Sequence, residues 1–238
     1  LFGGGVNSNL IEFVTISTLG DAVDFGNLTI EKWMGDGGFS SPTRALFAGG
    51  YGQPSYNNAI DSIEIPTLGN GTDFGDLTQL TYYLSGASSH TRGCWGGGYK
   101  VPSGANTNVI SYSTIASAGN ATDFGDTTAA RETSGGGSSS IRGIFMGGYS
   151  GGDTNAIEFI TIASAGNSTD FGDLTAARRN GGSLSNSLRC LYAGGHTSLN
   201  TIDFVIIATT GNASEFGDLL VGQRINPNHA SDSHGGLS

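Results

Sequence analysis

The chain is poor in the residue types that build charged binding surfaces and disulfide-stapled folds. Its 238 residues include two cysteines, five prolines and ten basic residues, against twenty acidic ones, for a formal net charge of −10. Two cysteines are too few for a disulfide framework, and an acidic surface repels nucleic acid and anionic membranes. No apolar run approaches the roughly 20 residues of a membrane-spanning helix. We therefore expect no nucleic acid partner and no membrane insertion.

Motifs of catalysis and metal binding are missing as well. The four histidines form no His-x-His or His-Glu-x-x-His pattern, and no catalytic constellation accompanies them. These absences predict a protein that is not an enzyme and that needs no metal and no cofactor.

Glycine is the residue type in excess, with 41 copies. It does not recur at every third position, which excludes collagen. Glycine and proline together stay below the roughly 25–30 % that marks low-complexity disordered chains. A chain of this length buries roughly 70–75 % of its unfolded surface, so a folded core is expected.

Three features recur five times and define a repeat. A Phe-Gly pair begins at Phe25, Phe74, Phe124, Phe171 and Phe216. A Gly-Gly pair ends at Gly5, Gly50, Gly98, Gly148 and Gly195. An isoleucine opens an apolar stretch at Ile11, Ile60, Ile110, Ile157 and Ile202. The step from Gly-Gly to the next isoleucine varies (6, 10, 12, 9 and 7 residues), whereas the step from Phe-Gly back to the preceding turn glycine is always 5, so one variable loop interrupts a constant scaffold.

Each repeat reads as four short strands, shown most clearly by residues 135–140, 142–146, 157–162 and 168–175. The third strand is rich in β-branched and aromatic residues, and Gly, Asn, Asp and Ser mark the turns. No window shows convincing helical periodicity. Four strands in a unit of 45–50 residues, repeated five times, are typical of a β-propeller.

The repeat resembles the Kelch repeat, in which a Gly-Gly doublet closes the second strand and an aromatic residue precedes the fourth. Phenylalanine stands here where that family usually has tryptophan, and an arginine follows the fourth strand at Arg131, Arg178 and, one position late, Arg224. More narrowly, residues 161–175 resemble repeats in virion structural and tail-fibre proteins of marine, cyanophage-type viruses. This resemblance implies a virion location, other virion proteins as partners, and assembly of copies within a fibre.

The length predicts a closed ring. The chain holds five periods of about 47 residues, and its last three residues are in the register of its first three. We expect residues 1–238 to form a single all-β domain, a five-bladed β-propeller of four-stranded blades, as part of a longer virion protein. The N-terminus would supply strands two to four of one blade, and residues 226–233 its first strand, so that the ring leaves no open edge.

The repeated residues are assigned structural roles. Each Phe of Phe-Gly is expected to pack between blades, and each Gly to allow close backbone approach. The aspartates around Phe-Gly either bind calcium or, as we favour, cap turns and pair with the repeated arginines. The sequon asparagines Asn70, Asn120, Asn167 and Asn212 are interpreted as turn residues. Cys94 and Cys190 belong to non-adjacent blades and are expected to be buried free thiols.

The variable loops are the candidate binding region, because they join strands two and three and open on the same face as the blade-to-blade connections. A rigid scaffold that presents variable loops is a common layout of binding surfaces. The candidate residues are aromatic or polar: Tyr51, Tyr56, Tyr99, Lys100, Tyr149 and His196. Rings with polar tips suit contacts with sugars or proteins. The alternative is ordinary loop drift, with the tyrosines packing on a neighbouring blade.

The function expected from these observations is a non-enzymatic structural or interaction module of a phage virion, on a tail fibre or the capsid exterior. The alternative is a lectin-type propeller that binds a host-surface glycan or receptor. A multivalent lectin should repeat its sugar contacts, whereas these loops differ in length and content, which favours an asymmetric protein contact.

Overall fold

The computed structural model describes residues 1–5, 8–33, 37–52, 55–132, 134–196, 198–222 and 229–231. Throughout these residues the regular elements are β-strands, in agreement with the all-β prediction. The same residues contain no helix of the length and apolarity needed to cross a membrane.

Five sheets with one strand order follow each other along the chain. Sheet 1 contains β1 (Phe2–Gly3), β2 (Leu10–Phe13) and β3 (Val23–Asn27). Sheet 2 contains β4 (Phe39–Ser40), β5 (Arg44–Ala48), β8 (Ala59–Glu64) and β9 (Thr72–Asp76). Sheet 3 contains β11 (Ser85–Ser88), β12 (Arg92–Gly96), β15 (Val109–Thr114) and β16 (Thr122–Asp126).

Sheets 4 and 5 continue the series, and two small sheets lie in the loops. Sheet 4 contains β17 (Gly135–Ser138), β18 (Arg142–Met146), β19 (Ala156–Thr161) and β20 (Thr169–Asp173). Sheet 5 contains β21 (Gly182–Ser185), β22 (Arg189–Ala193), β23 (Thr201–Ile206), β24 (Ser214–Asp218) and β25 (His229–Ser231). The small sheets pair β6 (Tyr51–Gly52) with β7 (Ser55–Tyr56), and β13 (Tyr99–Lys100) with β10 (Thr81–Tyr82) and β14 (Ala105–Asn106).

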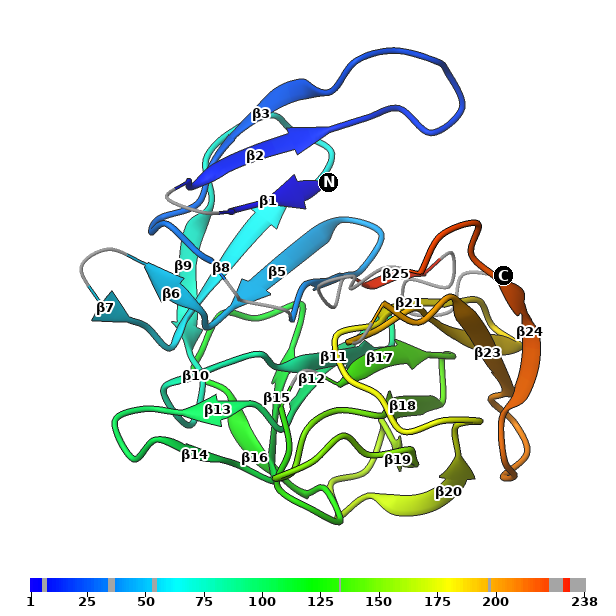
Figure 1. Ribbon diagram of the computed structural model, residues 1–238. Coiled ribbons are helices and arrows are strands. Elements are labelled where there is room, and N and C mark those ends of the chain that lie inside the picture. The colour runs from blue at the N-terminus through cyan, green and yellow to red at the C-terminus, as the bar shows by residue number, and fades with distance from the viewer. Residues whose placement is uncertain are drawn as a thin grey trace.

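The five sheets are arranged along an arc, with their short first strands toward the middle and their fourth strands outward (Figure 1). The first strands β11, β17 and β21 pack side by side. This arrangement is compatible with a β-propeller-like fold, in which no sheet closes on itself.

The hydrophobic core is divided into layers between successive sheets. In each layer the preceding sheet provides the Phe of Phe-Gly, and the following sheet provides an aromatic residue of its second strand. The last three layers add an isoleucine just after the third strand of the following sheet, whereas the first layer has Ile63 inside that strand. Between sheets 4 and 5 these are Phe171, Tyr192 and Ile207, all almost fully buried. The predicted packing of the Phe of Phe-Gly between neighbouring units is confirmed, as packing between successive sheets, for Phe25, Phe74, Phe124 and Phe171. Phe216, on the last sheet, is 54 % exposed.

Backbone hydrogen bonds join each sheet to the next at the Phe-Gly pair. Between sheets 3 and 4, the N–H of Gly166 donates to the carbonyl oxygen of Phe124 at 2.7 Å. In the same joint, the side-chain oxygen of Asn167 accepts the N–H of Asp126 at 3.0 Å. The turn asparagines of all four joints accept in this way, as their interpretation predicted: Asn70, Asn120, Asn167 and Asn212.

The glycine of Phe-Gly permits this close approach. A Cβ placed on Gly125 would lie 2.5 Å from the backbone carbonyl of Gly166, and Gly125 has a φ of 144°. Only glycine is free of both restrictions, the contact and the left-handed backbone. The expected role of this residue is therefore confirmed.

Buried ion pairs lie at three of the four joints, the contacts between successive sheets. Arg131 lies 2.5 Å from Glu158, and Arg178 lies 2.9 Å from Asp203. Lys32 makes the corresponding pair with Asp61 at 3.5 Å, and burial lowers the pKa of Lys32 against the opposing effect of that carboxylate. The hypothesis that the repeated arginines contact the aspartates around Phe-Gly, between strands or blades, is wrong in its choice of carboxylates, although Arg131 and Arg178 do pair with acidic residues. The partners come from third strands, whereas Asp73 and Asp123 beside Phe-Gly accept a backbone N–H two residues later.

A second arginine position ties the opposite ends of the strands together. Arg44, Arg92 and Arg142 each open a second strand and donate to a backbone carbonyl in the next sheet, at 2.9, 2.9 and 3.0 Å. The acceptors are Ile115, Ile162 and Ile207. The conformation of Arg224 lies outside the described residues.

The thiols agree with the sequence interpretation. Cys94 and Cys190 are both free and buried, in sheets 3 and 5. Burial raises the pKa of each to about 12, so the thiolate, the reactive form, is scarce at neutral pH.

The described C-terminal residues that were expected to give sheet 1 its first strand belong to sheet 5 instead. Of residues 226–233, the structure describes 229–231, which form β25 and pair in parallel with β21 of sheet 5. The assignment to sheet 1 is therefore wrong for these residues, and sheet 1 has three strands. The free inner edge of β21 offers unpaired backbone groups, and β25 satisfies them.

The buried pair of Arg178 and Asp203 should be a large contributor to stability once formed. We expect Asp203→Asn to reduce the free energy of unfolding by about 3–5 kcal/mol, because it leaves a buried guanidinium without its countercharge. Asp73→Ala, which removes an exposed carboxylate bonded only to its own turn, should cost about 1 kcal/mol or less. Urea unfolding of both variants measures the difference, and equal losses would contradict the assignment.

Candidate binding surface on the loop face

The loops between strands two and three pack on the connections that enter the same sheet. Trp33 and Tyr51 exchange two backbone hydrogen bonds of 2.7 Å, and the N–H of His196 donates to the carbonyl of Arg179 at 2.7 Å. Loops and connections thus share one face of the molecule, as the sequence predicts. We call it the loop face, formed by residues 30–33, 49–52, 55–58, 79–84, 97–108, 131–132, 147–155, 178–181, 194–196 and 198–200.

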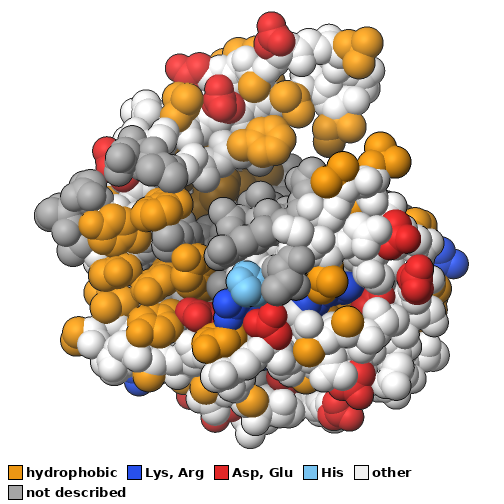
Figure 2. Space-filling view, viewed as in Figure 1, with side chains coloured by type: hydrophobic (Ala, Val, Ile, Leu, Met, Phe, Trp, Pro, Cys, Tyr) orange, Lys and Arg blue, Asp and Glu red, His pale blue; other side chains and the backbone are white. Residues whose placement is uncertain are grey.

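An aromatic cluster occupies the part of the loop face that belongs to sheets 2 and 3. The rings of Tyr56 and Tyr82 stack with centroids 5.0 Å apart and an interplanar angle of 18°. Further rings extend this pair, at centroid distances between 4.8 and 6.3 Å: Trp33, Tyr51, Tyr83 and Tyr99. Figure 2 shows hydrophobic side chains gathered in this region of the molecule, around β6 and β13 of Figure 1.

The tyrosines of the aromatic cluster are neither buried nor fully exposed. All five are intermediate in exposure, and Trp33 is 36 % exposed. Burial raises the pKa of Tyr82, and the neighbouring hydroxyl of Tyr56, to which it hydrogen-bonds, raises it further. The cluster therefore presents neutral rings and hydroxyl groups, a surface that combines apolar contact with hydrogen bonding.

Tyr83 adopts a backbone conformation that is costly for its residue type. Its φ is 58°, in the left-handed region, and the equivalent residue of the next described repeat with this geometry is Asn180, with φ 55°. Asparagine tolerates this region, whereas a bulky side chain is strained there. Tyr83 nevertheless places its ring 4.8 Å from that of Tyr82. Strain of this kind concentrates at functional positions.

A charged cluster lies on the neighbouring part of the loop face, over sheets 4 and 5. Arg179 lies 3.4 Å from Asp153 and 4.2 Å from the ring centroid of Tyr149. His196 approaches Asp153 at 3.7 Å and Arg179 at 3.5 Å. Nearby, desolvation raises the pKa of Glu132, and the charge of Arg179 opposes this effect. Red, blue and pale blue side chains adjoin the hydrophobic region in Figure 2.

The structure therefore divides the six predicted residues into two groups. Tyr51, Tyr56 and Tyr99 belong to the aromatic cluster, and Tyr149 and His196 to the charged cluster. Lys100 follows Tyr99 on β13, where its backbone pairs with Thr81, and it is half-buried. Tyr51, Tyr99, Tyr149 and His196 all occupy the position directly after a Gly-Gly doublet, so one repeat position serves both clusters.

Sequence reasoning missed the residues that the blade connections contribute. These are Trp33, Tyr82, Tyr83, Glu132 and Arg179, together with Asp153 of a variable loop. The adjacent pair Tyr82–Tyr83, two rings side by side in a connection between sheets, was the available signal.

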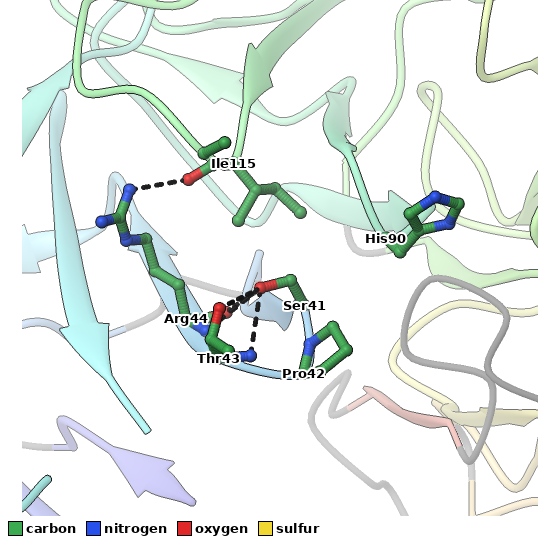
Figure 3. A pocket seen from close by; sticks show the side chains of 7 residues that line it. Ser41, Pro42, Thr43, Arg44, His90 and Ile115 are labelled. Atoms are coloured by element: carbon green, nitrogen blue, oxygen red, sulfur yellow. Dashed lines mark hydrogen bonds between the residues drawn. The ribbon is translucent and has the colours of Figure 1, made fainter. Parts of the chain in front are cut away.

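A cavity of about 490 Å³ opens at the other ends of the strands. Figure 3 shows it between Pro42 and Arg44, at the start of β5, and two residues next to strands of sheet 3: His90 before β12 and Ile115 after β15. The polar groups are engaged internally: Ser41 accepts the N–H of Arg44 at 3.1 Å, and the Arg44 guanidinium binds Glu64 and the carbonyl of Ile115. This cavity is an element of the joint between sheets 2 and 3.

In the part of the chain that the structure describes, no group of three or more His, Cys, Asp or Glu side chains is placed to hold a metal ion. No protein-family model matches the chain, and no curated protein matches it.

Replacing Tyr83 with asparagine should show whether backbone strain or the ring contact of Tyr83 has the larger effect on stability. We expect Tyr83→Asn to leave the free energy of unfolding unchanged or to raise it by up to about 1 kcal/mol, because asparagine relieves the left-handed strain, which offsets the loss of the contact with the ring of Tyr82. Thermal and urea unfolding measure this. A loss above about 1.5 kcal/mol would show that the ring contact, rather than the strain, dominates.

Proposed function

We propose that this chain is a non-enzymatic binding module: a five-bladed β-propeller that displays one asymmetric partner-binding surface on its loop face. The carrying observation is the aromatic cluster, six rings from two adjacent repeats that remain partly open to solvent. Exposed rings with hydroxyl groups, held on a rigid scaffold, suit an interaction surface.

The asymmetry favours one partner over five equal ligands. The position after the Gly-Gly doublet carries a ring in four repeats, but its neighbours differ. Tyr99 contacts the ring of Tyr82, whereas Tyr149 contacts the guanidinium of Arg179. A repeated small-ligand site requires the same contacts in each repeat, and a single extended partner does not.

The setting that we propose is the exterior of a phage virion, on a tail fibre or the capsid, with other virion proteins as partners. Its support is the resemblance of residues 161–175 to repeats of such proteins. In this setting the loop face would contact another virion protein, and the chain would form part of a longer polypeptide.

Lysine chemistry offers a direct test, because the chain has only Lys32 and Lys100. Lys32 is buried in its ion pair, and Lys100 is half-buried beside the aromatic cluster. We expect an amine-reactive cross-linker, applied to purified virions and followed by mass spectrometry, to join Lys100 to another virion protein. Failure to find the polypeptide in purified particles would remove the virion assignment. Finding the polypeptide without a Lys100 cross-link, while lysines of other virion proteins do cross-link, would remove the loop-face contact.

The second candidate function is binding of a host-surface glycan, and the partly exposed rings of the aromatic cluster favour it. Sugar rings stack on aromatic faces, and tyrosine hydroxyls hydrogen-bond sugar hydroxyls. On a glycan array, we expect this function to appear as binding that free glycan competes away.

A matched pair of variants locates such binding. Tyr99→Ala and Tyr149→Ala remove rings from the same repeat position, one in the aromatic cluster and one in the charged cluster. Tyr99→Ala should weaken glycan binding about tenfold or more, as for the loss of a contact worth 1.4 kcal/mol, and Tyr149→Ala should change it less than about twofold. Equal losses would place the glycan elsewhere, and absence of array binding by the parent chain would remove this second function.

A further inference from the structure

The two ends of the arc carry the unmatched halves of an inter-sheet joint. In the internal joints, the preceding sheet buries a Phe and the following sheet buries an aromatic residue and an isoleucine. At the free end of sheet 5, Phe216 is 54 % exposed; at the free end of sheet 1, Phe2 is 62 % and Ile16 is 98 % exposed. Phe2 and Ile16 occupy the repeat positions of Tyr192 and Ile207, which are almost fully buried against sheet 4.

We propose that the outer edge of β24 is a docking site for the turn 20–22 of the same chain, so that sheet 1 packs on sheet 5 as a fifth joint. This inference rests on the five-bladed architecture proposed above and identifies the groups that close it. The two segments belong to the first and last sheets of the arc in Figure 1.

The backbone contacts of this fifth joint follow from the other four. The N–H of Gly20 takes the role of Gly211, which donates to Phe171 at 2.7 Å, and donates to the carbonyl of Phe216. The N–H of Ala22 donates to the carbonyl of Asp218, as that of Ala213 does to Asp173 at 2.8 Å.

Asp21 replaces the turn asparagine of the other repeats and keeps the acceptor that this position uses. In the internal joints the Asn side-chain oxygen accepts an N–H at 3.0–3.1 Å. A carboxylate oxygen of Asp21 accepts equally well from the N–H of Asp218. The nearby carboxylate of Asp218 repels Asp21, which makes this joint sensitive to salt.

At the opposite end of the strands of sheet 5, an arginine is placed to contact sheet 1. Arg189 occupies the position of Arg44, Arg92 and Arg142, each of which donates to the carbonyl of an isoleucine in the next sheet. The equivalent carbonyl is that of Ile16. In the open arrangement, Arg189 is exposed and lies over the ring of Phe204, 5.0 Å from its centroid.

The fifth joint differs from three of the internal ones in its polar centre. Glu12 takes the position of Asp61, Glu158 and Asp203, but the basic position that would face it is Gln223, which lies outside the described residues. Glutamine carries no charge, so Glu12 and Gln223 cannot form an ion pair. The fifth joint is therefore held by backbone hydrogen bonds and apolar contact, and it lacks the buried ion pair that three internal joints have.

The occupant is the chain's own turn because the two halves are tethered. A head-to-tail interface either closes into a ring or continues into a filament, and a tethered partner acts at an effective concentration of up to millimolar. Five units lie within the range of four to eight blades in which propellers close. Docking buries the exposed side chains of both ends within one molecule.

A matched pair of glycine variants tests the proposal. Gly125→Ala introduces a Cβ 2.5 Å from the next sheet's backbone, whereas the equivalent Cβ on Gly217, with φ 151°, meets nothing within 4 Å in the open arrangement. Backbone strain alone lowers the folding equilibrium constant about tenfold in either variant. If the fifth joint forms, the clash is added in both, and we expect Gly217→Ala to lower the urea midpoint nearly as far as Gly125→Ala. A Gly217→Ala chain that loses only the strain contribution overturns the proposal.

A disulfide measurement identifies the occupant. In Asp21→Cys/Asp218→Cys, mild oxidation should give an intramolecular disulfide, seen as a monomer two mass units lighter, while Cys94 and Cys190 stay buried. Asn212→Cys/Asp173→Cys, at an internal joint, is the control for bond formation. A ladder of linked copies would show that a second chain docks instead, and no bond while the control forms one would also overturn docking by the chain's own turn. Neither result bears on ligand binding by Tyr99, so failure here is distinguishable from failure of the proposed binding surface.

Discussion

The structure depends on how closely the backbones of two successive sheets approach at the Phe-Gly pair. The carbonyl of Phe124 reaches the N–H of Gly166 because the next residue, Gly125, has no Cβ to hold the strands apart. That approach fixes the angle between neighbouring sheets, which in turn sets how much room the ring of Phe124 has in the apolar layer. Hydrogen bond and burial are thus coupled: a side chain at Gly125 would disturb both, because the same movement lengthens the bond and opens the core.

Because these joints satisfy the backbone hydrogen bonds of the scaffold, the sequences of the loop face can differ from repeat to repeat. In the four repeats that have a ring directly after the Gly-Gly doublet, the positive-φ glycines before the ring fix its position, whatever surrounds it. Tyr51 and Tyr99 meet other rings, and Tyr149 meets Arg179. The scaffold fixes the backbone position of this residue. The side chains of the neighbouring sheet-to-sheet connection determine whether the surface around it is aromatic or charged.

The sequence predicts the parts of the fold that recur, and little of what occurs once. Phe-Gly packing, the turn asparagines and the buried thiols follow from spacing, because five copies in register average out local ambiguity. The acidic partners of Arg131 and Arg178 were missed because Glu158 and Asp203 lie inside third strands that read as apolar, where a lone carboxylate gives no periodic signal. The placement of β25 depends on which free edge is available in space, and the aromatic cluster on contacts between residues 26 positions apart, such as Tyr56 and Tyr82. Neither is encoded in a local pattern.

The joint between sheets 2 and 3 links stability to the proposed function. Thr81 and Ser111 stand there at the positions that carry an ion pair in the other three joints. Thr78 hydrogen-bonds Ser111 at 2.5 Å, as Thr175 hydrogen-bonds Asp203 in the joint between sheets 4 and 5. The aromatic cluster lies directly beyond Thr81, since Tyr82 and Tyr83 follow it in the chain. Rings that cross from sheet 2 to sheet 3, as Tyr56 does to Tyr82, contribute apolar contact where charge pairing is missing. The same rings therefore have two roles, holding together a joint that lacks a buried ion pair and presenting a partly exposed surface. A partner that covers them would bury area that the joint alone leaves open, and would bind the two sheets more firmly to each other.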